Sequence, residues 1–339
     1  MPIRVAINGF GRIGEMVLRT RLARPSSPVQ IVAINDIVPL DTISYLLRRD
    51  SVHQGSPRDV ESGPGWVRVG GSEITIYQER EPERLPWGDL GIDVAVESTG
   101  VFEDREGMSR HLQAGAARVV LTAPAKNDDA DVTVCVGVNE SALDLAKHRL
   151  ISNASCTTNC LAPVLRALDE AFGVEWGLVT TIHAYTGSQA LVDAANKNPT
   201  RGRAAALNIV PTTTGAAKAI GLVLPHLQGR VDGMAFRVPV PDGSVIDLVF
   251  GTRDPISIEA INAALTAAAA DPSYRGVLTV AEEPLVSTDI IGDPRSAIVD
   301  TASTMVQGDH RAKVVAWYDN EWGYASRVLD LLEIIAGRS

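Results

Sequence analysis

The stretch IRVAINGFGRIG, residues 3–14, decides how the first half of the chain folds. It begins with an apolar run of strand length and continues into GFGRIG at residues 9–14, a G-x-G-x-x-G motif at the point where a strand turns into a helix. Glycines allow the tight turn, and the helix N-terminus offers free N–H groups and a positive dipole end to a pyrophosphate. A helix over residues 13–23 and a strand over 29–35 complete a βαβ unit, so the stretch predicts a dinucleotide site.

An acid at the end of the second strand supports this prediction. Asp36 follows Gly14 by 22 residues, near the spacing at which a carboxylate binds the ribose of an adenosine. The alternative is a glycine turn that only packs helix on strand, with Asp36 as an ordinary loop acid. Because the motif and the acid occur together, the dinucleotide site is the preferred interpretation.

Length and composition exclude several classes of protein. At roughly 150 residues per domain, a chain of 339 residues is expected to form two domains. Apolar residues make up 45% and charged residues 21%, which excludes bulk disorder. A formal charge of −10 without a long basic block argues against a nucleic-acid partner. No apolar run reaches the roughly 18 residues of a spanning helix, which argues against a membrane partner.

The pattern of elements changes near the middle of the chain. The first half alternates short β-rich runs with helical stretches, which favours a parallel sheet with crossover connections. Later strand candidates lie at 178–185, 234–240, 244–252 and 313–319. Their shorter connections favour a mixed, largely antiparallel sheet. The sequence therefore predicts an α/β first domain and an α+β second domain, with a last amphipathic helix in YASRVLDLLEIIAG.

The three cysteines bear on both location and chemistry. Their odd number suits a reducing compartment better than a disulfide framework, and the N-terminus does not resemble a secretory signal, so a cytoplasmic protein is expected. Cys156 lies in SCTTN, residues 155–159, just before a helix. A thiolate is stabilised at that positive end, which makes Cys156 a candidate nucleophile. The alternative, a small cysteine that only packs, is the interpretation for Cys135 and Cys160.

A thiolate nucleophile commonly needs a base within hydrogen-bond reach. His183 ends the strand LVTTIH and precedes the turn AYTG, which presents it at a sheet edge where active-site loops gather. The alternative is a histidine satisfied in the core. The other five histidines lie in polar or charged stretches and are expected at the surface: His53, His111, His148, His226 and His310.

Two further features point to an anion. PTTTGAAKAIGLVLP, residues 211–225, places three threonines and Gly215 at the start of a helix, where hydroxyls and backbone donors can hold a phosphate. The alternative is an ordinary threonine cap that binds nothing. Arg237 interrupts the apolar strand MAFRVPV, where an unpaired guanidinium is costly. Arg237 therefore needs an anion, either a protein carboxylate or a ligand phosphate.

Together these segments resemble the phosphorylating (type I) glyceraldehyde-3-phosphate dehydrogenase family. The resemblance follows the chain in order over nearly its whole length, through INGFGRIG, ESTGVF, TAPAK, ISNASCTTNCLAP, HAYT, TTTGAAKA, GMAFRVP and WYDNEWGY. It implies a Rossmann NAD(P)-binding domain over residues 1–153, joined by the C-terminal helix 320–339, and a catalytic domain over 154–319. It also implies a homotetramer that oxidises D-glyceraldehyde 3-phosphate with inorganic phosphate to 1,3-bisphosphoglycerate. The expected course is a cysteine thiohemiacetal, hydride transfer to NAD, and a thioester.

The resemblance also assigns roles to residues, with no metal among them. Cys156 is the nucleophile and His183 its base. The cofactor-binding residues that it implies are Gly9, Gly11, Arg12, Ile13, Gly14, Asp36, Arg80, Thr122 and Asn320. The residues that it implies for two anion pockets, one for the substrate phosphate and one for inorganic phosphate, are Ser155, Thr157, Thr186, Arg201, Thr214, Gly215 and Arg237.

Two segments depart from the family pattern. RVPVPDGS at 237–244 stands where many members read RVPTPNVS, and Thr200 stands where an arginine is frequent.

The choice between NAD and NADP depends on two further positions. Asp36 favours NAD because it repels a 2′-phosphate. Ala194-Ala195 resembles the small pair of NADP-accepting relatives, so NAD is favoured and NADP stays open. The alternatives in function are an erythrose-4-phosphate dehydrogenase, which releases a free acid, and a non-catalytic dinucleotide-sensing module.

Overall fold

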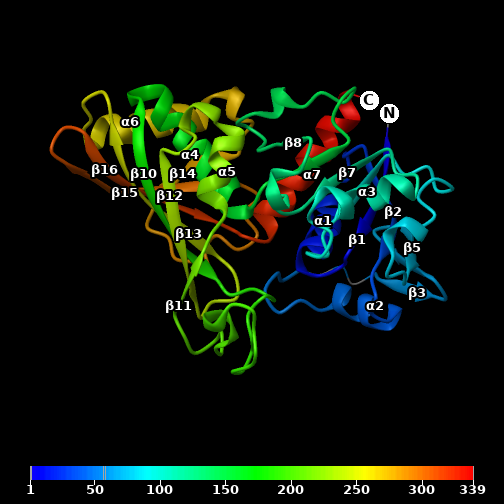
Figure 1. Cartoon of the computed structure of the whole chain (residues 1–339). Coiled ribbons are helices and arrows are strands. Elements are labelled where there is room, and N and C mark those ends of the chain that lie inside the picture. The colour runs from blue at the N-terminus through cyan, green and yellow to red at the C-terminus, as the bar shows by residue number, and fades with distance from the viewer. Residues whose placement is uncertain (1, 56, 58, 339) are drawn as a thin grey trace. The chain divides into compact units, whose positions relative to one another are not determined.

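The computed structural model describes residues 2–55, 57 and 59–338, and the chain divides into two compact units (Figure 1). The first unit contains Met1–Val134, Glu140–Ala154 and Ala325–Ser339. The second contains Cys135–Asn139 and Ser155–Tyr324. Among the described residues, no helix is both long and apolar enough to cross a membrane.

The first unit is built on a nine-stranded sheet in the order β3-β4-β5-β2-β1-β6-β7-β9-β8. Its strands are β1 (Ile3–Asn8), β2 (Val29–Asn35), β3 (Glu61–Gly63), β4 (Trp66–Val69), β5 (Ser72–Tyr77), β6 (Val94–Glu97), β7 (Arg118–Leu121), β8 (Val132–Thr133) and β9 (Leu150–Ser152). Neighbouring strands run parallel except in the pairs β3-β4 and β4-β5. This is the predicted α/β sheet, and it places the ends of β1, β2, β6 and β7 along one carboxyl edge.

Three helices of this unit lie between its strands in chain order, and a fourth, the last helix of the chain, joins them. They are α1 (Arg12–Ala23), α2 (Leu40–Arg48), α3 (Arg105–Gln113) and the last helix α7 (Trp322–Arg338), with short 3₁₀ turns η1 (Pro82–Arg84), η2 (Lys126–Asp128) and η3 (Glu140–Ala142). From Ala325 onward, α7 belongs to the first unit. Arg24, just past α1, forms an ion pair with Asp330 on α7, which ties the two chain ends of the unit together.

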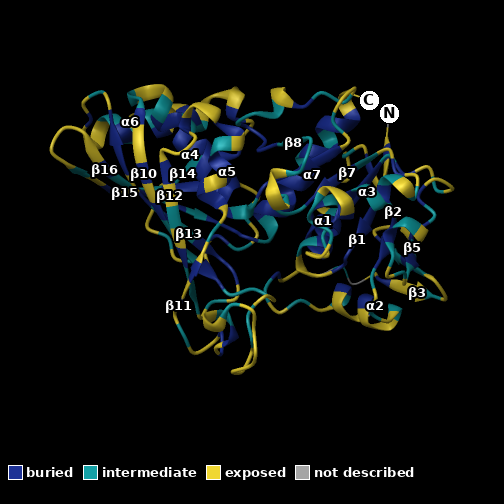
Figure 2. Cartoon of the chain, in the orientation of Figure 1, coloured by how far each residue is buried: buried dark blue, intermediate teal, exposed yellow. Residues whose placement is uncertain are grey.

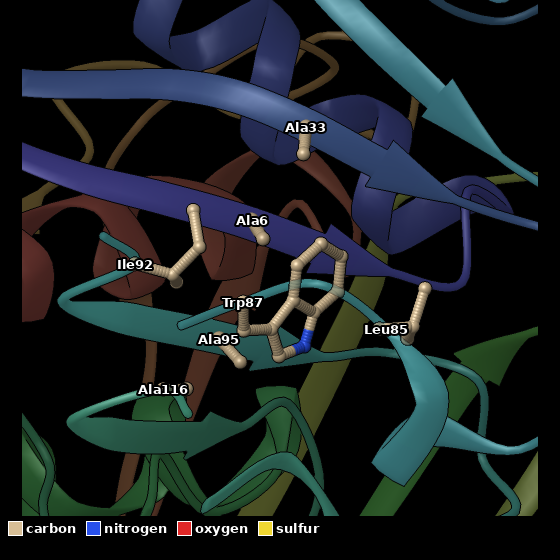
Figure 3. Close-up of a cluster of buried hydrophobic side chains, with 7 residues drawn as sticks. All are labelled: Ala6, Ala33, Leu85, Trp87, Ile92, Ala95 and Ala116. Atoms are coloured by element: carbon tan, nitrogen blue, oxygen red, sulfur yellow. The ribbon is translucent and has the colours of Figure 1, made fainter. Parts of the chain in front are cut away.

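A buried indole fills the space beside the centre of this sheet (Figure 3). Trp87 is fully buried and packs with Ala6 on β1, Ala33 on β2 and Ala95 on β6. Three small side chains on adjacent strands leave room for one large ring, and interiors tolerate few voids. The indole N–H is the polar end of this side chain, and a buried indole N–H is usually paired with an acceptor.

The second unit has a seven-stranded sheet in the order β11-β12-β10-β13-β16-β15-β14. Its strands are β10 (Val174–Ala184), β11 (Val210–Thr213), β12 (Val231–Val238), β13 (Ser244–Thr252), β14 (Leu278–Val280), β15 (Ala297–Gln307) and β16 (Arg311–Tyr318). The pairs β10-β12 and β14-β15 are parallel and the other four are antiparallel. The predicted mixed, largely antiparallel second sheet is confirmed.

Helices pack against this second sheet. They are α4 (Cys156–Phe172), α5 (Ala216–Val223) and α6 (Ile258–Ala270), with 3₁₀ turns η4 (Pro199–Gly202), η5 (Pro225–Leu227) and η6 (Pro272–Tyr274). Helix α4 contacts β10 and β13, α5 contacts β12, and α6 contacts β14 and β15. Buried residues run through most of α4 (Figure 2). The helix that begins with Cys156 is therefore held rigidly against the core.

Candidate active site

The position of Cys156 follows from how α4 begins. Ser155 is the N-cap residue, and its Oγ accepts a hydrogen bond from the N–H of Thr158 at 3.0 Å. Such a cap satisfies one of the free N–H groups of the first turn. Cys156 is the first helical residue and is half-buried, whereas Cys135 and Cys160 are fully buried, as the sequence predicts.

His183 approaches this cysteine from the sheet. It lies next to last in β10, is 3% exposed, and its Nε2 is 3.4 Å from Sγ of Cys156. The parallel register of β10 and β12 pairs His183 with Arg237. The carboxyl ends of two neighbouring strands, β10 and β12, and one helix N-terminus thus bring together a thiol, an imidazole and a guanidinium that are far apart in the sequence.

The protonation states of this pair differ from the sequence expectation of a resting thiolate. Burial raises the pKa of the Cys156 thiol, although the charge of Arg237 and hydrogen bonds from Thr157 oppose that rise. Burial first, and the charge of Arg237 second, lower the pKa of His183 to about 3. At neutral pH both groups are therefore uncharged: at Cys156 burial outweighs the opposing charge of Arg237, and at His183 burial and that charge act in the same direction. A neutral imidazole is the form that accepts a proton.

Tyr318 is a member of the site that the sequence reasoning missed. Its hydroxyl lies 2.9 Å from Oγ1 of Thr157 and 2.8 Å from Oγ1 of Thr181. Its ring meets the His183 ring edge to face, with centroids 5.9 Å apart. Tyr318 therefore holds the start of α4 against the end of β10. The sequence could have indicated this role, because Tyr318 lies in the family segment WYDNEWGY, two residues before Asn320.

The residues predicted for the anion pockets are brought together only in part. Arg201 lies close enough to lower the pKa of both His183 and Arg237, and its Nε donates to Oγ1 of Thr212 at 3.0 Å. The Nε of Arg237 is buried without a hydrogen-bond partner. Two guanidinium groups thus share one region beside the Cys156–His183 pair, and a bound anion would satisfy both.

The other predicted anion residues make hydrogen bonds within their own loops. Thr186 shares a hydrogen bond with Ser188 at 3.0 Å, and Thr214 Oγ1 accepts from the N–H of Ala216 at 3.2 Å. Gly215 is the N-cap residue of α5, with no side chain to cap the helix. Asn320, predicted for the nicotinamide, accepts from the Ser244 hydroxyl at 2.5 Å in the second unit.

In the first unit the glycine motif forms the turn between β1 and α1. Gly9 has φ +90°, and a Cβ there would meet the Thr99 backbone at 2.6 Å. A Cβ at Gly14 would lie 2.1 Å from the carbonyl oxygen of Gly9. A Cβ at Gly11 would meet nothing within 4 Å, and Gly11 caps α1 without a side chain. The turn therefore leaves open backbone at a helix N-terminus, which fits a pyrophosphate.

Asp36 is joined to this turn. Its Oδ2 accepts a hydrogen bond from the N–H of Phe10 at 2.6 Å and its Oδ1 from the N–H of Val38 at 3.1 Å. The acid thus lies beside the glycine turn at the carboxyl ends of β1 and β2, where open α/β sheets bind their ligands. This geometry fits a dinucleotide with the adenosine ribose at Asp36.

The remaining predicted cofactor residues are spread over the same unit. Arg12 is exposed and forms an ion pair with Asp50 at 2.5 Å. Ile13 is half-buried, Arg80 is exposed, and Thr122 donates its hydroxyl to the carbonyl of Glu97 at 3.1 Å. Thr122 therefore lies at the carboxyl edge formed by β6 and β7.

A second buried histidine, His111 on α3, contacts the end of β6. His111 is fully buried, so the prediction of a surface position is wrong, and the same holds for His53 at 5% exposure. Trp87 donates its indole N–H to Nδ1 of His111 at 3.1 Å, so Nε2 carries the proton and donates to Glu97 at 3.0 Å. Asn8 also donates to Glu97, at 2.6 Å. The prediction failed because the charged residues next to His111 in the sequence say nothing about where the His111 side chain itself lies.

These features define a two-domain α/β dehydrogenase, with a dinucleotide-binding sheet in one unit and a cysteine–histidine pair in the other. A family model described as "Glyceraldehyde 3-phosphate dehydrogenase, NAD binding domain" matches residues 3–105, and the corresponding C-terminal domain model matches 155–320. The chain belongs to the glyceraldehyde-3-phosphate dehydrogenase family. The predicted family and the prediction of NAD as cofactor are confirmed.

Similar proteins cover the chain from end to end. Glyceraldehyde-3-phosphate dehydrogenase 2 of Streptomyces arenae is 51% identical over 335 residues, which cover 99% of each chain. Glyceraldehyde-3-phosphate dehydrogenase 2 of Bacillus subtilis is 48% identical over 338 residues, which cover 100% of this chain and 98% of the relative. The enzyme of Geobacillus stearothermophilus is also 48% identical, over 100% and 99% of the two chains.

Proposed function

We propose that this chain catalyses the reversible oxidative phosphorylation of D-glyceraldehyde 3-phosphate to 1,3-bisphosphoglycerate, with NAD as the hydride acceptor, in glycolysis or gluconeogenesis. The observation that carries the proposal is the 3.4 Å separation between Sγ of Cys156 and Nε2 of His183 at the N-terminus of α4. The curated relatives described above are named for the same aldehyde.

The protonation states set how the reaction starts. Because the pKa of Cys156 is raised and that of His183 lowered, Sγ attacks the aldehyde carbon as its proton moves to Nε2. His183 then returns that proton to the new alkoxide, giving the hemithioacetal. Free N–H groups at the start of α4 stabilise the negative charge that develops on sulfur and oxygen.

Oxidation and phosphate transfer use the same two residues. NAD, held by the glycine turn and Asp36, would supply the hydride acceptor for this oxidation. His183 takes up the hydroxyl proton in that step, which leaves a thioester on Cys156. Inorganic phosphate attacks the thioester carbonyl, the carbon–sulfur bond breaks, and His183 returns its proton to the departing sulfur.

The anion pockets are proposed around the two guanidinium groups. The unpaired Nε of Arg237 and the electrostatic effect of Arg201 on its neighbours support a phosphate group beside the reacting pair. The residues proposed to complete the two pockets are Ser155, Thr157, Thr186, Thr214 and Gly215. Local hydrogen bonds outweigh the net charge of −10, because screening weakens charge effects beyond about 10 Å.

The cofactor residues are proposed as a set, with NAD preferred over NADP. The hydrogen bond from Phe10 to Asp36 supports a carboxylate at the ribose, which would repel a 2′-phosphate. The other members of the set are Gly9, Gly11, Arg12, Ile13, Gly14, Arg80, Thr122 and Asn320. We expect kcat/KM to be higher with NAD, and a clear preference for NADP would contradict the role of Asp36.

We also propose a cytoplasmic homotetramer with domains at residues 1–153 plus 320–339 and at 154–319. Large apolar side chains in the loop after β10 support self-association, because they are 67–83% exposed: Leu191, Val192, Leu207 and Ile209. Sedimentation velocity of the full chain tests this, and a monomer at micromolar concentration would contradict it.

The decisive experiment is an NADH absorbance assay of the full chain with glyceraldehyde 3-phosphate, varying coenzyme and phosphate independently. Turnover is expected to require phosphate, since phosphate releases the acyl group. The Cys156→Ser variant is expected to lose turnover by about a thousandfold or more while its NAD affinity stays within about twofold. Phosphate-independent turnover of erythrose 4-phosphate would favour the alternative dehydrogenase, and turnover in the serine variant would overturn the nucleophile assignment.

A further inference from the structure

Three neighbouring strands of the first sheet end in the same pattern. Strands β1 and β2 both end in VAIN, and β6 ends in VAVE. The strand register pairs the last residue of β1, Asn8, with the last residues of the other two strands, Asn35 and Glu97. All three are at most 3% exposed. A row of three buried polar side chains thus crosses the carboxyl edge of the sheet.

The alanines of the same pattern place this row beside the buried indole. Side chains two residues apart lie on the same face of a strand, so the row shares its face with the three alanines that pack against Trp87 (Figure 3). The Trp87 N–H reaches His111, and His111 reaches Glu97. The packing of the indole and the polar row are therefore two parts of one arrangement.

Hydrogen bonds join the row from strand to strand. Asn35 donates from Nδ2 to Oδ1 of Asn8 at 2.7 Å, and Asn8 donates from Nδ2 to Oε2 of Glu97 at 2.6 Å. At the other end, the Asn35 amide accepts from the N–H of Glu79 and donates to its carbonyl oxygen, both at 2.8 Å. The row therefore connects the segments that follow β5, β2, β1 and β6.

Glu97 receives four hydrogen bonds. Oε1 accepts from the backbone N–H of Thr99 at 2.8 Å and from its hydroxyl at 2.5 Å. Oε2 accepts from Asn8 and from Nε2 of His111, two donors that lie 3.5 Å apart. Because all four partners donate, both oxygens act only as acceptors, as those of a carboxylate do. Glu97 is the one charged side chain among those that make this row.

The residues proposed to bind the dinucleotide follow the row directly in the sequence. Gly9 follows Asn8, and Asp36 follows Asn35. The N–H of Gly9 also donates to the carbonyl oxygen of Asn35 at 2.8 Å. The glycine turn and the acid at the proposed ribose position are therefore both anchored to neighbouring members of the row.

The segment after Glu97 packs against the same turn. Ser98 donates its hydroxyl to the carbonyl oxygen of Gly9 at 2.6 Å. A Cβ at Gly9 would lie 2.6 Å from the backbone nitrogen of Thr99, the same N–H that donates to Glu97. The close approach of these two turns thus depends on where Glu97 holds Thr99.

We propose that Glu97 is a positioning residue for the dinucleotide. Its carboxylate fixes the turns after β1 and β6 against each other and, through Asn8 and Asn35, the segment that carries Asp36. Glu97 is fully buried, so it acts through the glycine turn and not by contact with the cofactor. This inference rests on the proposed function, because that function places NAD at the glycine turn.

The charge of Glu97 and its hydrogen bonds act on the dinucleotide in opposite directions. A carboxylate at this edge repels a pyrophosphate, so its charge alone weakens binding. Its hydrogen bonds hold the turns in one arrangement, so less conformational freedom is lost when the ligand binds. A variant that removes the charge but keeps the shape therefore separates the two effects by their sign.

The test is calorimetric titration of the full chain with NAD, without substrate, for the wild type and Glu97→Gln. Glutamine has nearly the same shape, but its NH₂ group meets donors where a carboxylate oxygen accepts. The Kd for NAD is expected to rise about tenfold, and the Kd for ADP-ribose, which lacks the nicotinamide, to rise by the same factor. In turnover, KM for NAD is expected to rise while kcat stays within about threefold. An unchanged or lower Kd would overturn the inference.

Thr99→Val and Thr99→Ser keep the inference testable if the glutamine variant fails to fold, because Thr99 is exposed. Valine removes the hydroxyl that donates to Glu97 and accepts from the N–H of Val101, whereas serine keeps it. The Kd for NAD is expected to rise about threefold in the valine variant and to equal that of the wild type in the serine variant. Equal values in the two variants would contradict the role of Glu97.

Met108→Ala is the control for a general loss of stability. Met108 is fully buried on α3, the helix that carries His111, and packs in an apolar cluster with Val119, Leu121 and Leu150. Its truncation is expected to lower the urea midpoint and to leave the Kd for NAD unchanged. A Kd that rises as much in Met108→Ala as in Glu97→Gln would reduce the effect to lost stability and overturn the inference.

The titration and the turnover assay distinguish this inference from the proposed function. A chain that shows the expected change in NAD affinity but does not turn over glyceraldehyde 3-phosphate would remove the proposed function and keep the role of Glu97. Turnover by the wild type, together with wild-type NAD affinity in Glu97→Gln, would remove the role of Glu97 and keep the proposed function.

Discussion

Two buried histidines, one in each unit, show opposite designs. His111 in the first unit is fully buried: Trp87 donates to Nδ1, and Nε2 donates to Glu97 at 3.0 Å, with the amide nitrogen of Asn8 farther from Nε2 at 3.5 Å. His183 in the second unit is 3% exposed, but its Nδ1 faces both a carbonyl and a guanidinium, and its Nε2 faces a thiol. The first ring has one possible tautomer and the second has two.

The difference separates a structural polar group from a reactive one. A buried network whose members are all satisfied is rigid, and breaking it leaves groups that cannot return to water. A neutral imidazole with a donor and an acceptor at the same nitrogen has two tautomers of similar energy. A small change in its surroundings therefore shifts the ratio of the two tautomers. Burial alone therefore does not distinguish a catalytic histidine from a structural one. The hydrogen-bond partners of the two ring nitrogens do.

The largest effect is expected from His183→Asn. Removing the base should lower kcat by roughly 10²–10⁴-fold, while the free energy of unfolding at neutral pH changes by less than about 1 kcal/mol. Steady-state NADH formation and urea unfolding of the same preparation measure the two quantities. A variant that kept wild-type kcat would place the base elsewhere and break the comparison.

The reverse pattern is expected from His111→Ala. The change leaves a cavity, an unpaired indole N–H on Trp87 and one lost donor to Glu97, so the free energy of unfolding should fall by about 3 kcal/mol, with kcat within about threefold of the wild type. Trp87→Phe is the companion variant: it removes the donor to His111 and leaves part of the indole's space empty, so it should cost about 2 kcal/mol, also without a loss of kcat. A large loss of kcat in a stably folded His111→Ala would assign the network to catalysis.

The pH dependence of stability tests the comparison at His183 alone. The pKa of His183 is about 3 in the folded chain against an ordinary 6.5, so between these values the unfolded chain binds a proton that the native ring does not. This group therefore supports stability above pH 6.5 and loses it as the pH falls toward 3, by at most about 1.4 kcal/mol per unit. The stability difference between the wild type and His183→Asn should be flat above pH 7 and fall below it; a flat difference down to pH 4 would contradict the lowered pKa.

Sequence reasoning succeeded where local pattern and chemistry coincide. The glycine turn and the helix start at Cys156 are specified by neighbours within a few residues, and Asp36 by its spacing from the turn; the structure places all three in the expected local elements. It failed for His111, because the residues that bury it, Trp87 and Glu97, come from other segments. Charged neighbours along the chain carry no information about such partners.

The sequence by itself determined the family, the dinucleotide motif, the first βαβ unit, the kind of sheet in each half, and the candidates for nucleophile and base, because each of these depends on patterns along the chain. Only the tertiary structure decided that Cys156 and His183 meet, that Arg237 sits in register beside the ring, and that both pKa values favour the neutral forms. Those outcomes depend on strand register and on removal from water, which are properties of segments packed together. No single segment carries them.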